Sequence, residues 1–403
     1  MRIVRKPTLF VLTVGAAALV LCQPQEARAD KFQACVQGLW PSAKAAGVKR
    51  ETFDRATQGM THNPKVIEQA TFQPEYKRPV GEYVDRAVSD KRLETGKQML
   101  VDNKELLDKI EPKYGVDRHV LVAIWGMESN YGTQPGDMNV IQSLATLICS
   151  GTKSKFARQQ FVSALRILQR GDISHEAMNG SWAGAMGHTQ FIPTTYSAYA
   201  VDYDGDGKRD IWGNIPDALA STGSYLKVSN WQPGASWGYE VRVPKGFNAK
   251  GVSEKKLRSL AEWQKAGFVR VDGKPYPRPG DKAGLFAPEG NSGPAFLVLN
   301  NFRSILRYNQ ANSYALAVGH LSDRLRGGGP FVQPWPSDEN RLSLDQRKEL
   351  QQLLVVRGLL EGDPDGVIGP MTLEAVKTYQ RSKNLPVDGF PTLTILKALR
   401  AEG

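Results

Sequence analysis

The stretch from residue 120 to residue 132 constrains the fold most, because its helical pattern leaves almost no polar face. Val120, Ile124 and Met127 recur at helical spacing, and the residues between them are also apolar. A helix that is apolar all round is buried in a large core. We therefore expect the chain to fold around this helix, with Gly132 as its C-cap.

Glu128 places one carboxylate near the end of this buried helix. Loss of water at the edge of a core disfavours the charged form of an acid, so we expect the pKa of Glu128 to be raised. A carboxylic acid that stays protonated near neutral pH can act as a general acid. The alternative is a structural Glu paired with Arg or Lys at a helix end, and this stretch alone does not decide between the two.

The first 29 residues have the pattern of a signal peptide. Three basic residues precede a short apolar run over residues 8–21, and residues 27–29 form a small-residue cleavage site. The run is too short for a stable membrane span. Cys22 could be a lipoprotein acceptor, but a Leu precedes it where a small residue is expected. We therefore predict cleavage before Asp30 and export to the periplasm.

Charge and cysteines fit an exported protein. The net charge of +11 becomes +8 once residues 1–29 are removed, which suits an acidic polymer or an anionic surface. Export, and the lack of a basic stripe with interleaved aromatics, argue against nucleic acid. Cys35 and Cys149 remain, and an even pair in an oxidising compartment predicts a disulfide. Two buried free thiols are the alternative. We expect a monomer.

Most of the chain predicts helices, which makes the fold mainly α with a smaller β part (α+β). Short β-like runs between Gly and Pro turns predict a β insertion at about 238–300. Residues 327–340 hold three Gly and three Pro and predict a linker. Residues 341–403 form a separate small helical unit, in which Asp365-Gly366 and Asp388-Gly389 each lead into a helix.

Two stretches carry groups that could bind a ligand. Residues 181–193 are rich in Gly and Ala, with the hydroxyl of Ser181 and the amide of Gln190 toward the two ends. Such a segment can approach and orient a neutral polar ligand such as a sugar, or it can be a tightly packed turn. In residues 202–210, carboxylates at positions 1, 3, 5 and 9 with Gly at position 6 match the first part of an EF-hand calcium loop. The alternative for this loop is a solvated acidic turn.

Together these features resemble the lytic murein transglycosylase B family over residues 32–326. Four motifs carry the resemblance and occur in the family's order: Glu128-Ser129-x-x-Gly132, the segment 181–193, the acidic loop 202–210, and Asn301-Phe302 with Arg307-Tyr308-Asn309 and Ser313-Tyr314-Ala315. Residues 341–400 resemble the three-helix peptidoglycan-binding domain. The resemblance implies a lysozyme-like helical catalytic domain over residues 30–326, with an added α segment and a small β insertion.

The resemblance also implies the site. Glu128 falls on the catalytic acid, and the saccharide-contacting positions fall on Ser181, Gln190, Tyr225, Tyr308 and Tyr314. Calcium would be held by Asp202, Asp204, Asp206, the backbone of Lys208, Asp210 and Asp217. An extra residue before Asp217 and the Gly at position 12 of the loop depart from the usual pattern. His188 receives no catalytic role.

The implied reaction is cleavage of peptidoglycan between N-acetylmuramic acid and N-acetylglucosamine, leaving 1,6-anhydromuramic acid ends. Apart from the acidic loop, which is assigned to calcium, the four motifs contain no carboxylate other than that of Glu128. One carboxyl group suffices if a hydroxyl of the substrate is the nucleophile, since an intramolecular group has a very high effective concentration. A muramidase that uses water, and a non-catalytic wall-anchoring protein, are the two alternatives.

Overall fold

The computed structural model describes residues 23–70, 79–247, 253–290, 293–336, 342–385, 387 and 389–402, with side chains from residue 30 onward except that of residue 370. The helices are α1 (Gln23–Gln37), α2 (Trp40–Ala45), α3 (Arg50–Thr57), α4 (Pro64–Ala70), α5 (Val80–Ala87), α6 (Asp90–Asp102), α7 (Lys104–Tyr114), α8 (Arg118–Ser129), α9 (Val140–Cys149), α10 (Ser154–Arg170), α11 (Pro193–Tyr199), α12 (Ile215–Val228), α13 (Leu260–Lys265), α14 (Asn300–Tyr308), α15 (Asn312–Leu325), α16 (Leu344–Val356), α17 (Pro370–Ser382) and α18 (Leu393–Ala401). The strands are β1 (Met138–Asn139), β2 (Asn179–Gly180), β3 (Gly238–Arg242), β4 (Arg258–Ser259), β5 (Val269–Arg270), β6 (Lys282–Phe286) and β7 (Ala295–Val298).

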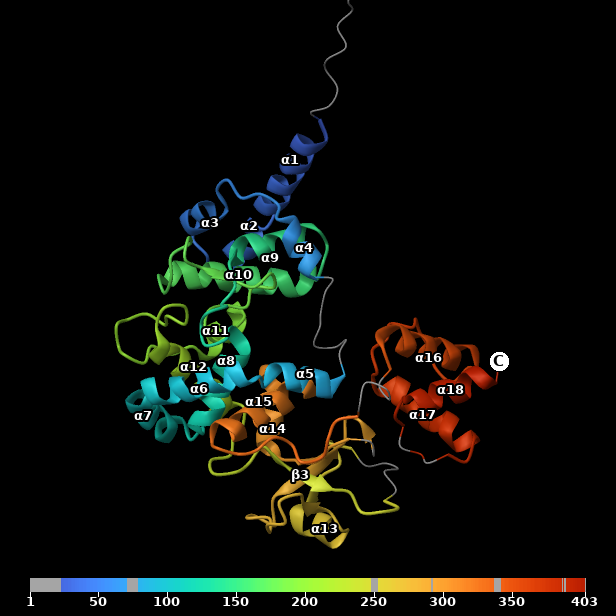
Figure 1. The fold of residues 1–403 in the computed structure, drawn as a ribbon. Coiled ribbons are helices and arrows are strands. Elements are labelled where there is room, and N and C mark those ends of the chain that lie inside the picture. The colour runs from blue at the N-terminus through green and yellow to red at the C-terminus, as the bar shows by residue number, and fades with distance from the viewer. Residues whose placement is uncertain are drawn as a thin grey trace, which may run out of the picture.

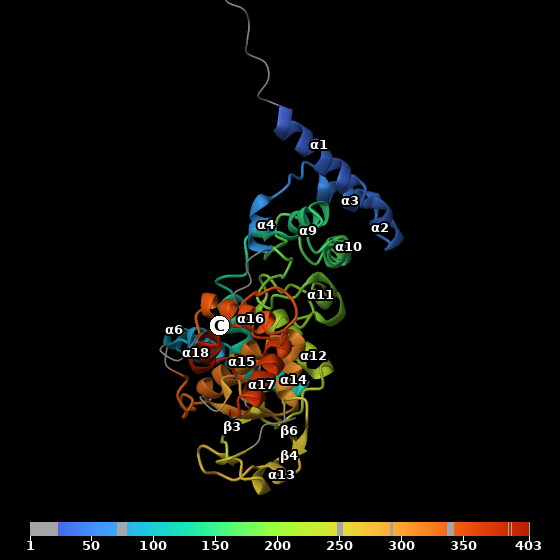
Figure 2. The ribbon, with the colours of Figure 1, turned by 90° about the vertical axis from the view of Figure 1, so that its right-hand side faces the viewer.

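Four hydrophobic clusters organise these elements. One unites α1–α4 with α9–α11, and a second unites α5–α8 with α12, α14 and α15. The third joins the larger sheet to α13, and the fourth holds α16–α18 together. Figure 1 shows the first three groups following one another along the molecule, with the last three helices to one side. In Figure 2, turned by 90°, these three helices lie in front of the other groups. The predicted mainly helical architecture, with a small β part and a small helical C-terminal unit, is confirmed.

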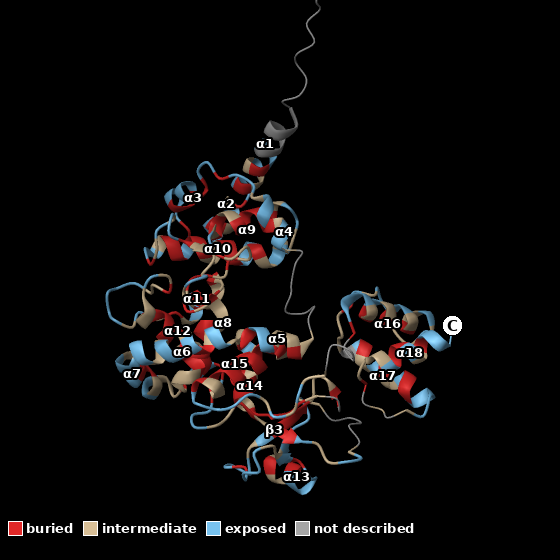
Figure 3. Ribbon diagram, in the orientation of Figure 1, coloured by how far each residue is buried: buried red, intermediate tan, exposed pale blue. Residues whose placement is uncertain are grey.

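Helix α8 is as buried as its sequence predicts. Every residue from Val120 to Gly126 is buried, and α8 packs against α6, α12 and, most extensively, α15. The side chain of Asp117 begins the helix by accepting a hydrogen bond from the backbone N–H of His119 at 2.8 Å. The buried parts of α15 and of the sheet complete the same core (Figure 3).

The end of α8 differs from the prediction. Asn130, with φ of +49°, is the C-cap, and Tyr131 and Gly132 follow with φ of +59° and +84°. The turn begins earlier because the Tyr131 ring packs where a Cβ on Gly96 or Gly126 would overlap with it. Its hydroxyl donates to the carbonyl of Arg92 at 2.8 Å. Burial of the ring thus offsets the cost of left-handed backbone at non-glycine residues.

Residues 84–110, whose apolar positions keep helical spacing throughout, are divided among α5, α6 and α7. The Ser89 side chain accepts a hydrogen bond from the backbone N–H of Arg92 and starts α6, while Asn103 lies between α6 and α7. Polar side chains that bond to nearby backbone compete with helix continuation. The apolar spacing persists across both breaks because each short helix presents one face to the same core.

The β part lies between residues 238 and 298. Five strands in the order β4–β6–β7–β3–β5 form an antiparallel sheet, with Glu240 opposite Phe296 and Leu285 opposite Leu297. One side packs on α13 through Trp263, and Phe286, Phe296 and Val298 belong to the core around α8. The sheet is therefore covered on both faces.

The middle of the predicted linker packs on this sheet, and we call residues 331–336 the strap. The Phe331 ring stacks on buried His320 with centroids 3.8 Å apart and contacts Phe296 at 4.8 Å. The carboxylate of Glu240 accepts hydrogen bonds from the backbone N–H groups of Val332 and Gln333, both at 2.8 Å. Residues 337–341 lie outside the described part of the chain.

Near the N-terminus, Cys35 of α1 is joined to Cys149 at the end of α9 by a disulfide, with Cα atoms 6.0 Å apart. Helix α1 begins at Gln23, so the predicted cleavage site at 27–29 lies within it, whereas residues 1–22, with Cys22, lie outside the described residues. Among the described helices, none is long and apolar enough to cross a bilayer.

The repeated Asp-Gly motif in the C-terminal unit has a structural cause. Buried Gln351 accepts a hydrogen bond from the N–H of Gly366 at 2.6 Å, and buried Gln380 accepts one from the N–H of Gly389 at 2.8 Å. The Asp365 carboxylate accepts from the N–H of Val367 and from the Gln351 amide, so it has the contacts of a turn residue. Asp388 lies outside the described residues.

The strap should stabilise the core that contains α8 and α15. We expect Phe331→Ala to lower the melting temperature of the full chain by about 5 °C, since truncating a half-buried aromatic costs about 2 kcal/mol. Val332→Ala is the matched control, because the Val332 side chain is 62% exposed beside the same backbone contacts. Differential scanning fluorimetry of both variants measures the effect, and equal melting temperatures for the two would contradict it.

Candidate active site

The end of α8 brings Glu128 against α15. The Glu128 side chain is half-buried, and the Tyr314 hydroxyl donates a hydrogen bond to its Oε1 at 2.5 Å. Tyr314 is itself only 3% exposed, in the first turn of a helix whose core-facing side is apolar. A hydrogen bond to the ionised form favours that form, so this contact opposes the loss of solvation. The expected rise in the pKa of Glu128 stays a prediction.

Tyr308 and Tyr314 form the phenolic wall beside Glu128. Burial and the neighbouring Glu128 charge raise the pKa of both hydroxyls well above the usual value. Both phenols therefore stay protonated at neutral pH and act as donors. The Tyr308 hydroxyl donates to the backbone carbonyl of Thr189 at 2.6 Å, which joins α14 to the segment 181–193.

The segment 181–193 is a tight turn held by its own polar groups. The Ser181 hydroxyl oxygen accepts from the N–H of Ala185 at 3.1 Å, and Met186 bridges to Gly180 and Phe191. Gly187, with φ of +63°, lies where a Cβ would be 2.3 Å from the carbonyl oxygen of Ile211. The packed-turn interpretation thus accounts for the backbone. Among the described residues, none accepts a hydrogen bond from the Ser181 hydroxyl, so its proton can be offered to a ligand.

Gln190 has a left-handed backbone with φ of +50°. Its amide nitrogen donates to the carbonyls of Pro135 and Gly187 at 2.8 and 2.9 Å. Within the described residues, its Oε1 accepts no hydrogen bond. A non-glycine residue in this conformation is held there by its surroundings and is often found at a functional site. Gln190 therefore offers one fixed acceptor.

Tyr225 extends the aromatic surface. Its ring lies 5.0 Å from that of Tyr308 and 4.9 Å from that of Tyr199, and Phe191 lies 5.7 Å from both Tyr225 and Tyr308. The Tyr225 hydroxyl donates to the carbonyl of Arg307 at 2.5 Å. The structure thus connects Tyr225, Tyr308 and the Gln190 turn to the neighbourhood of Glu128, through contacts among residues distant in sequence.

Sequence reasoning missed two residues at this site. Thr189 supplies the carbonyl that holds Tyr308, and His188 accepts a hydrogen bond from Trp125 of α8. A backbone acceptor leaves no signal in residue type. For His188, the available signal was a polar ring directly after the small residue Gly187 and two positions before Gln190.

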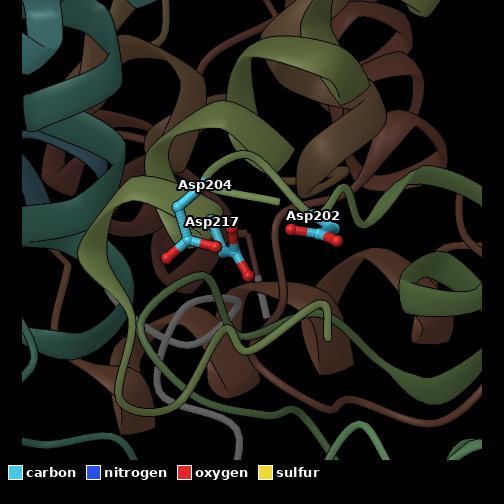
Figure 4. A group of neighbouring side chains, drawn as sticks. All are labelled: Asp202, Asp204 and Asp217. Atoms are coloured by element: carbon cyan, nitrogen blue, oxygen red, sulfur yellow. The ribbon is translucent and has the colours of Figure 1, made fainter. Parts of the chain in front are cut away.

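The acidic loop gathers three of the predicted ligands. Carboxylate oxygens of Asp202, Asp204 and Asp217 lie within 4.8 Å of one another (Figure 4). Asp217, in the first turn of α12, is fully buried, and burial followed by the charges of the two other acids raises its pKa to about 6 despite two backbone hydrogen bonds. Three crowded carboxylates repel one another, and hard oxygen donors of this kind fit Ca²⁺.

The other predicted ligands lie outside this group. The Asp206 carboxylate accepts from the N–H of Lys208, and the Asp210 carboxylate accepts from the N–H groups of Trp212 and Gly213. Arg209 occupies the loop position where an aliphatic residue is usual. It is ion-paired with the buried Asp172 at 2.9 Å, which explains this departure from the calcium-loop pattern.

Together, a mainly helical core and one half-buried carboxylate at the end of its central helix, hydrogen-bonded by a tyrosine, are typical of lysozyme-like enzymes that cleave glycosidic bonds. The model of the transglycosylase SLT domain family matches residues 31–323, and that of a peptidoglycan binding domain matches residues 343–399. The first match covers well over half of the chain. The chain belongs to the transglycosylase SLT domain family of lytic murein transglycosylases.

Individual proteins similar to this chain agree with the family match. The structure of SltB3 from Pseudomonas aeruginosa in complex with NAG-anhNAM-pentapeptide is 48% identical, with a TM-score of 0.86 over 92% of this chain and 99% of that chain. Membrane-bound lytic murein transglycosylase B from Escherichia coli (strain K12) is 28% identical over 250 residues, which are 59% of this chain and 65% of that protein. The chain thus spans less than two thirds of the curated relative it matches.

A third relative shares the fold. The Escherichia coli lytic transglycosylase Slt35, solved in complex with calcium, is 23% identical, with a TM-score of 0.63 over 75% of this chain and 94% of that chain. The resemblance to the lytic murein transglycosylase B family that the four motifs predicted is confirmed.

The Tyr314–Glu128 contact predicts a change in pH dependence. Tyr314→Phe removes the donor that stabilises ionised Glu128, so the pKa of Glu128 should rise. If Glu128 must be protonated to act, activity is lost as the pH rises through its pKa, and this loss should move to higher pH in the variant. We also expect kcat to fall by about 10- to 100-fold, as for loss of a hydrogen bond to a charged group.

The pH profile of kcat/KM on soluble glycan strands measures the change. Tyr276→Phe is the matched control, since it removes a buried tyrosine hydroxyl that donates to Phe268 at 3.1 Å in the β part. A Tyr314→Phe profile that coincides with the wild-type and control profiles would contradict the prediction.

Proposed function

We propose that this chain cleaves the β-1,4 bond between N-acetylmuramic acid and N-acetylglucosamine in peptidoglycan and leaves 1,6-anhydromuramic acid ends. The observation that carries the proposal is the single half-buried carboxylate of Glu128, hydrogen-bonded by Tyr314. Segments 181–193 and 300–315, which supply every other proposed site residue except Tyr225 of α12, contain no Asp or Glu. Enzymes that activate water place a second carboxylate about 5 Å or about 6.5–9.5 Å from the first.

In the first step, Glu128 acts as the general acid. Its proton passes to the glycosidic oxygen, the bond between that oxygen and C1 of muramic acid breaks, and the N-acetylglucosamine part leaves with a free 4-hydroxyl group. Positive charge develops at C1 and is stabilised by the neighbouring 2-acetamido group or by the cleft as an oxocarbenium ion. Glu128 is left as a carboxylate, which the Tyr314 hydroxyl stabilises.

In the second step, Glu128 acts as the general base. It takes the proton of the C6 hydroxyl of muramic acid, and O6 forms a bond with C1. The proton taken up equals the proton given in the first step, so Glu128 is regenerated and no water is consumed. Effective molarities of about 10⁵ M or more are attainable for well-oriented intramolecular groups, which makes an activated water unnecessary.

The substrate-contacting groups are Ser181, Gln190, Tyr225, Tyr308 and Tyr314. They offer a hydroxyl proton, an amide oxygen and aromatic faces, which suit the hydroxyl and acetamido groups and the apolar faces of sugar rings. The complex of SltB3 with NAG-anhNAM-pentapeptide supports this class of ligand. Because these donors and acceptors are neutral, they can hydrogen-bond to the uncharged hydroxyl and acetamido groups of the glycan without burying an unpaired charge.

The wider organisation follows from the same function. Residues 1–29 would direct export to the periplasm and be removed, residues 30–326 would form the catalytic domain with its β insertion, and residues 341–403 would bind peptidoglycan after a linker at 327–340. The peptidoglycan binding domain match at 343–399 supports the C-terminal assignment. The basic charge of the mature chain favours contact with an anionic wall polymer.

Mass analysis of the released muropeptides tests the reaction. Wild-type protein should release products one water lighter than hydrolysed muropeptides, and Glu128→Gln should abolish release, because the amide can neither give nor take the proton. Glu94→Gln is the matched control, since Glu94 is exposed on α6, and its products should equal those of the wild type. Reducing-end products would mean a water-using muramidase, and no products from the wild type would favour a wall-anchoring protein.

We also propose that the acidic loop holds a structural Ca²⁺. The carboxylates of Asp202, Asp204 and Asp217 would supply oxygen ligands, with Asp206, Asp210 and the carbonyl of Lys208 nearby. Bound Ca²⁺ would neutralise crowded negative charge around a buried acid. Asp217 already accepts hydrogen bonds from the N–H groups of Tyr203 and Asp210, at 2.7 and 2.8 Å, so its orientation does not depend on a ligand.

Removal of calcium should lower the melting temperature. A ligand at 100 times its Kd stabilises a protein by about 2.7 kcal/mol, which corresponds to a fall of about 5–10 °C in chelator. Asp204→Asn should abolish the difference between calcium and chelator, whereas Asp363→Asn, which changes an exposed acid of the C-terminal unit, should retain it. A wild-type melting curve that is the same in calcium and in chelator would refute the calcium site.

A further inference from the structure

His188 contacts α8 on both sides of Glu128. One turn before Glu128, the indole N–H of Trp125 donates to Nδ1 of His188 at 2.8 Å. Directly after it, the Ser129 hydroxyl donates to the His188 carbonyl at 2.8 Å. At the following turn, a Cβ on Gly132 would lie 2.1 Å from the His188 ring, so the ring fills the space that this glycine leaves.

The Trp125 contact fixes the state of the imidazole. An indole N–H is a donor only, so Nδ1 of His188 must accept and the ring proton lies on Nε2. The two rings lie 5.6 Å apart at an angle of 57°, which keeps the imidazole beside the indole. Burial lowers the pKa of His188, in keeping with a neutral ring.

The backbone of His188 is anchored on the opposite side. Its N–H donates to the carbonyl of Ile211 at 2.9 Å, and Gly187 lies directly against that carbonyl. Asp210, the residue before Ile211, donates a hydrogen bond from its backbone N–H to the buried carboxylate of Asp217 at 2.8 Å. His188 therefore does not adapt to α8, because its position is set from the side of the acidic loop.

We infer that His188 is a positioning residue, which holds the end of α8 so that the Glu128 carboxyl stays in register with the segment that carries Gln190. The inference rests on the proposed function of Glu128. The ring itself need not touch the glycan, since its contacts are with Trp125 and Gly132. What it fixes is the distance and direction between the proton donor and the sugar-contacting turn.

Positioning errors of about 1 Å can cost about 100-fold in rate while substrate binding is kept. We therefore expect His188→Phe, which fills the space but gives Trp125 no acceptor, to lower kcat by about 100-fold. KM should change by less than about threefold, because the sugar-contacting groups remain. The readout is kcat and KM on a soluble tetrasaccharide of alternating N-acetylglucosamine and N-acetylmuramic acid.

Rescue by a conservative variant separates positioning from packing. His188→Asn lacks the ring but carries an oxygen at the same distance from Cβ as Nδ1, so it can accept from Trp125. We expect its kcat to lie at least about tenfold above that of His188→Phe. If His188 only fills space, the order is reversed, because the aromatic variant keeps the packing.

Trp125→Phe completes the comparison. If the hydrogen bond carries the effect, Trp125→Phe and the double variant with His188→Phe should show similar losses of kcat, since both remove the same interaction. Multiplicative losses would overturn the inference. Assays run well below the melting temperature of each variant, so a variant's lower stability does not reduce its folded fraction.

Glu128→Gln is assayed in parallel, so that failure of the proposed function can be distinguished from failure of the positioning role of His188. If Glu128→Gln is active, the proposed function fails. If Glu128→Gln is inactive but His188→Phe keeps the wild-type kcat, the proposed function stands and the role of His188 is refuted.

Discussion

The packing of α8 against α15 is the constraint on which the rest of the structure depends. Because α8 has no polar face, it must be covered on all sides, and α6, α12 and α15 supply that cover. The same packing brings Tyr314 to Glu128 across 186 residues of sequence, with a hydrogen bond of 2.5 Å. A carboxylate on a rigid buried helix keeps its direction, which proton transfer requires.

Around this carboxylate, the site is built from phenols and backbone carbonyls. The Tyr308 hydroxyl donates to the carbonyl of Thr189, and the Tyr225 hydroxyl donates to that of Arg307. Each ring is therefore fixed by a hydrogen bond between two neutral groups. Burial keeps the phenols protonated, and the surface they form is aromatic and neutral. Such a surface suits a glycan, whose ring faces are apolar and whose edges carry hydroxyl groups.

The sequence predicted the helical class, the β insertion and the separate C-terminal unit, because hydrophobic period and turn residues are local signals. It did not predict where helices stop. The region 84–110 divides at Ser89 and Asn103, and α8 ends at Asn130 before the expected Gly132. In each case a side-chain hydrogen bond or a packed ring decided the boundary, which the apolar spacing does not encode.

The sequence by itself determined the buried helix with its terminal carboxylate, the small-residue turn and the acidic loop, since each is a contiguous pattern with a physical cause. Only the tertiary structure decided which groups meet. It brought Tyr314 to Glu128, Asp217 to Asp202, His188 to Trp125 and Phe331 to His320. These contacts arise when helices and loops pack to bury their apolar faces, and no local period encodes them.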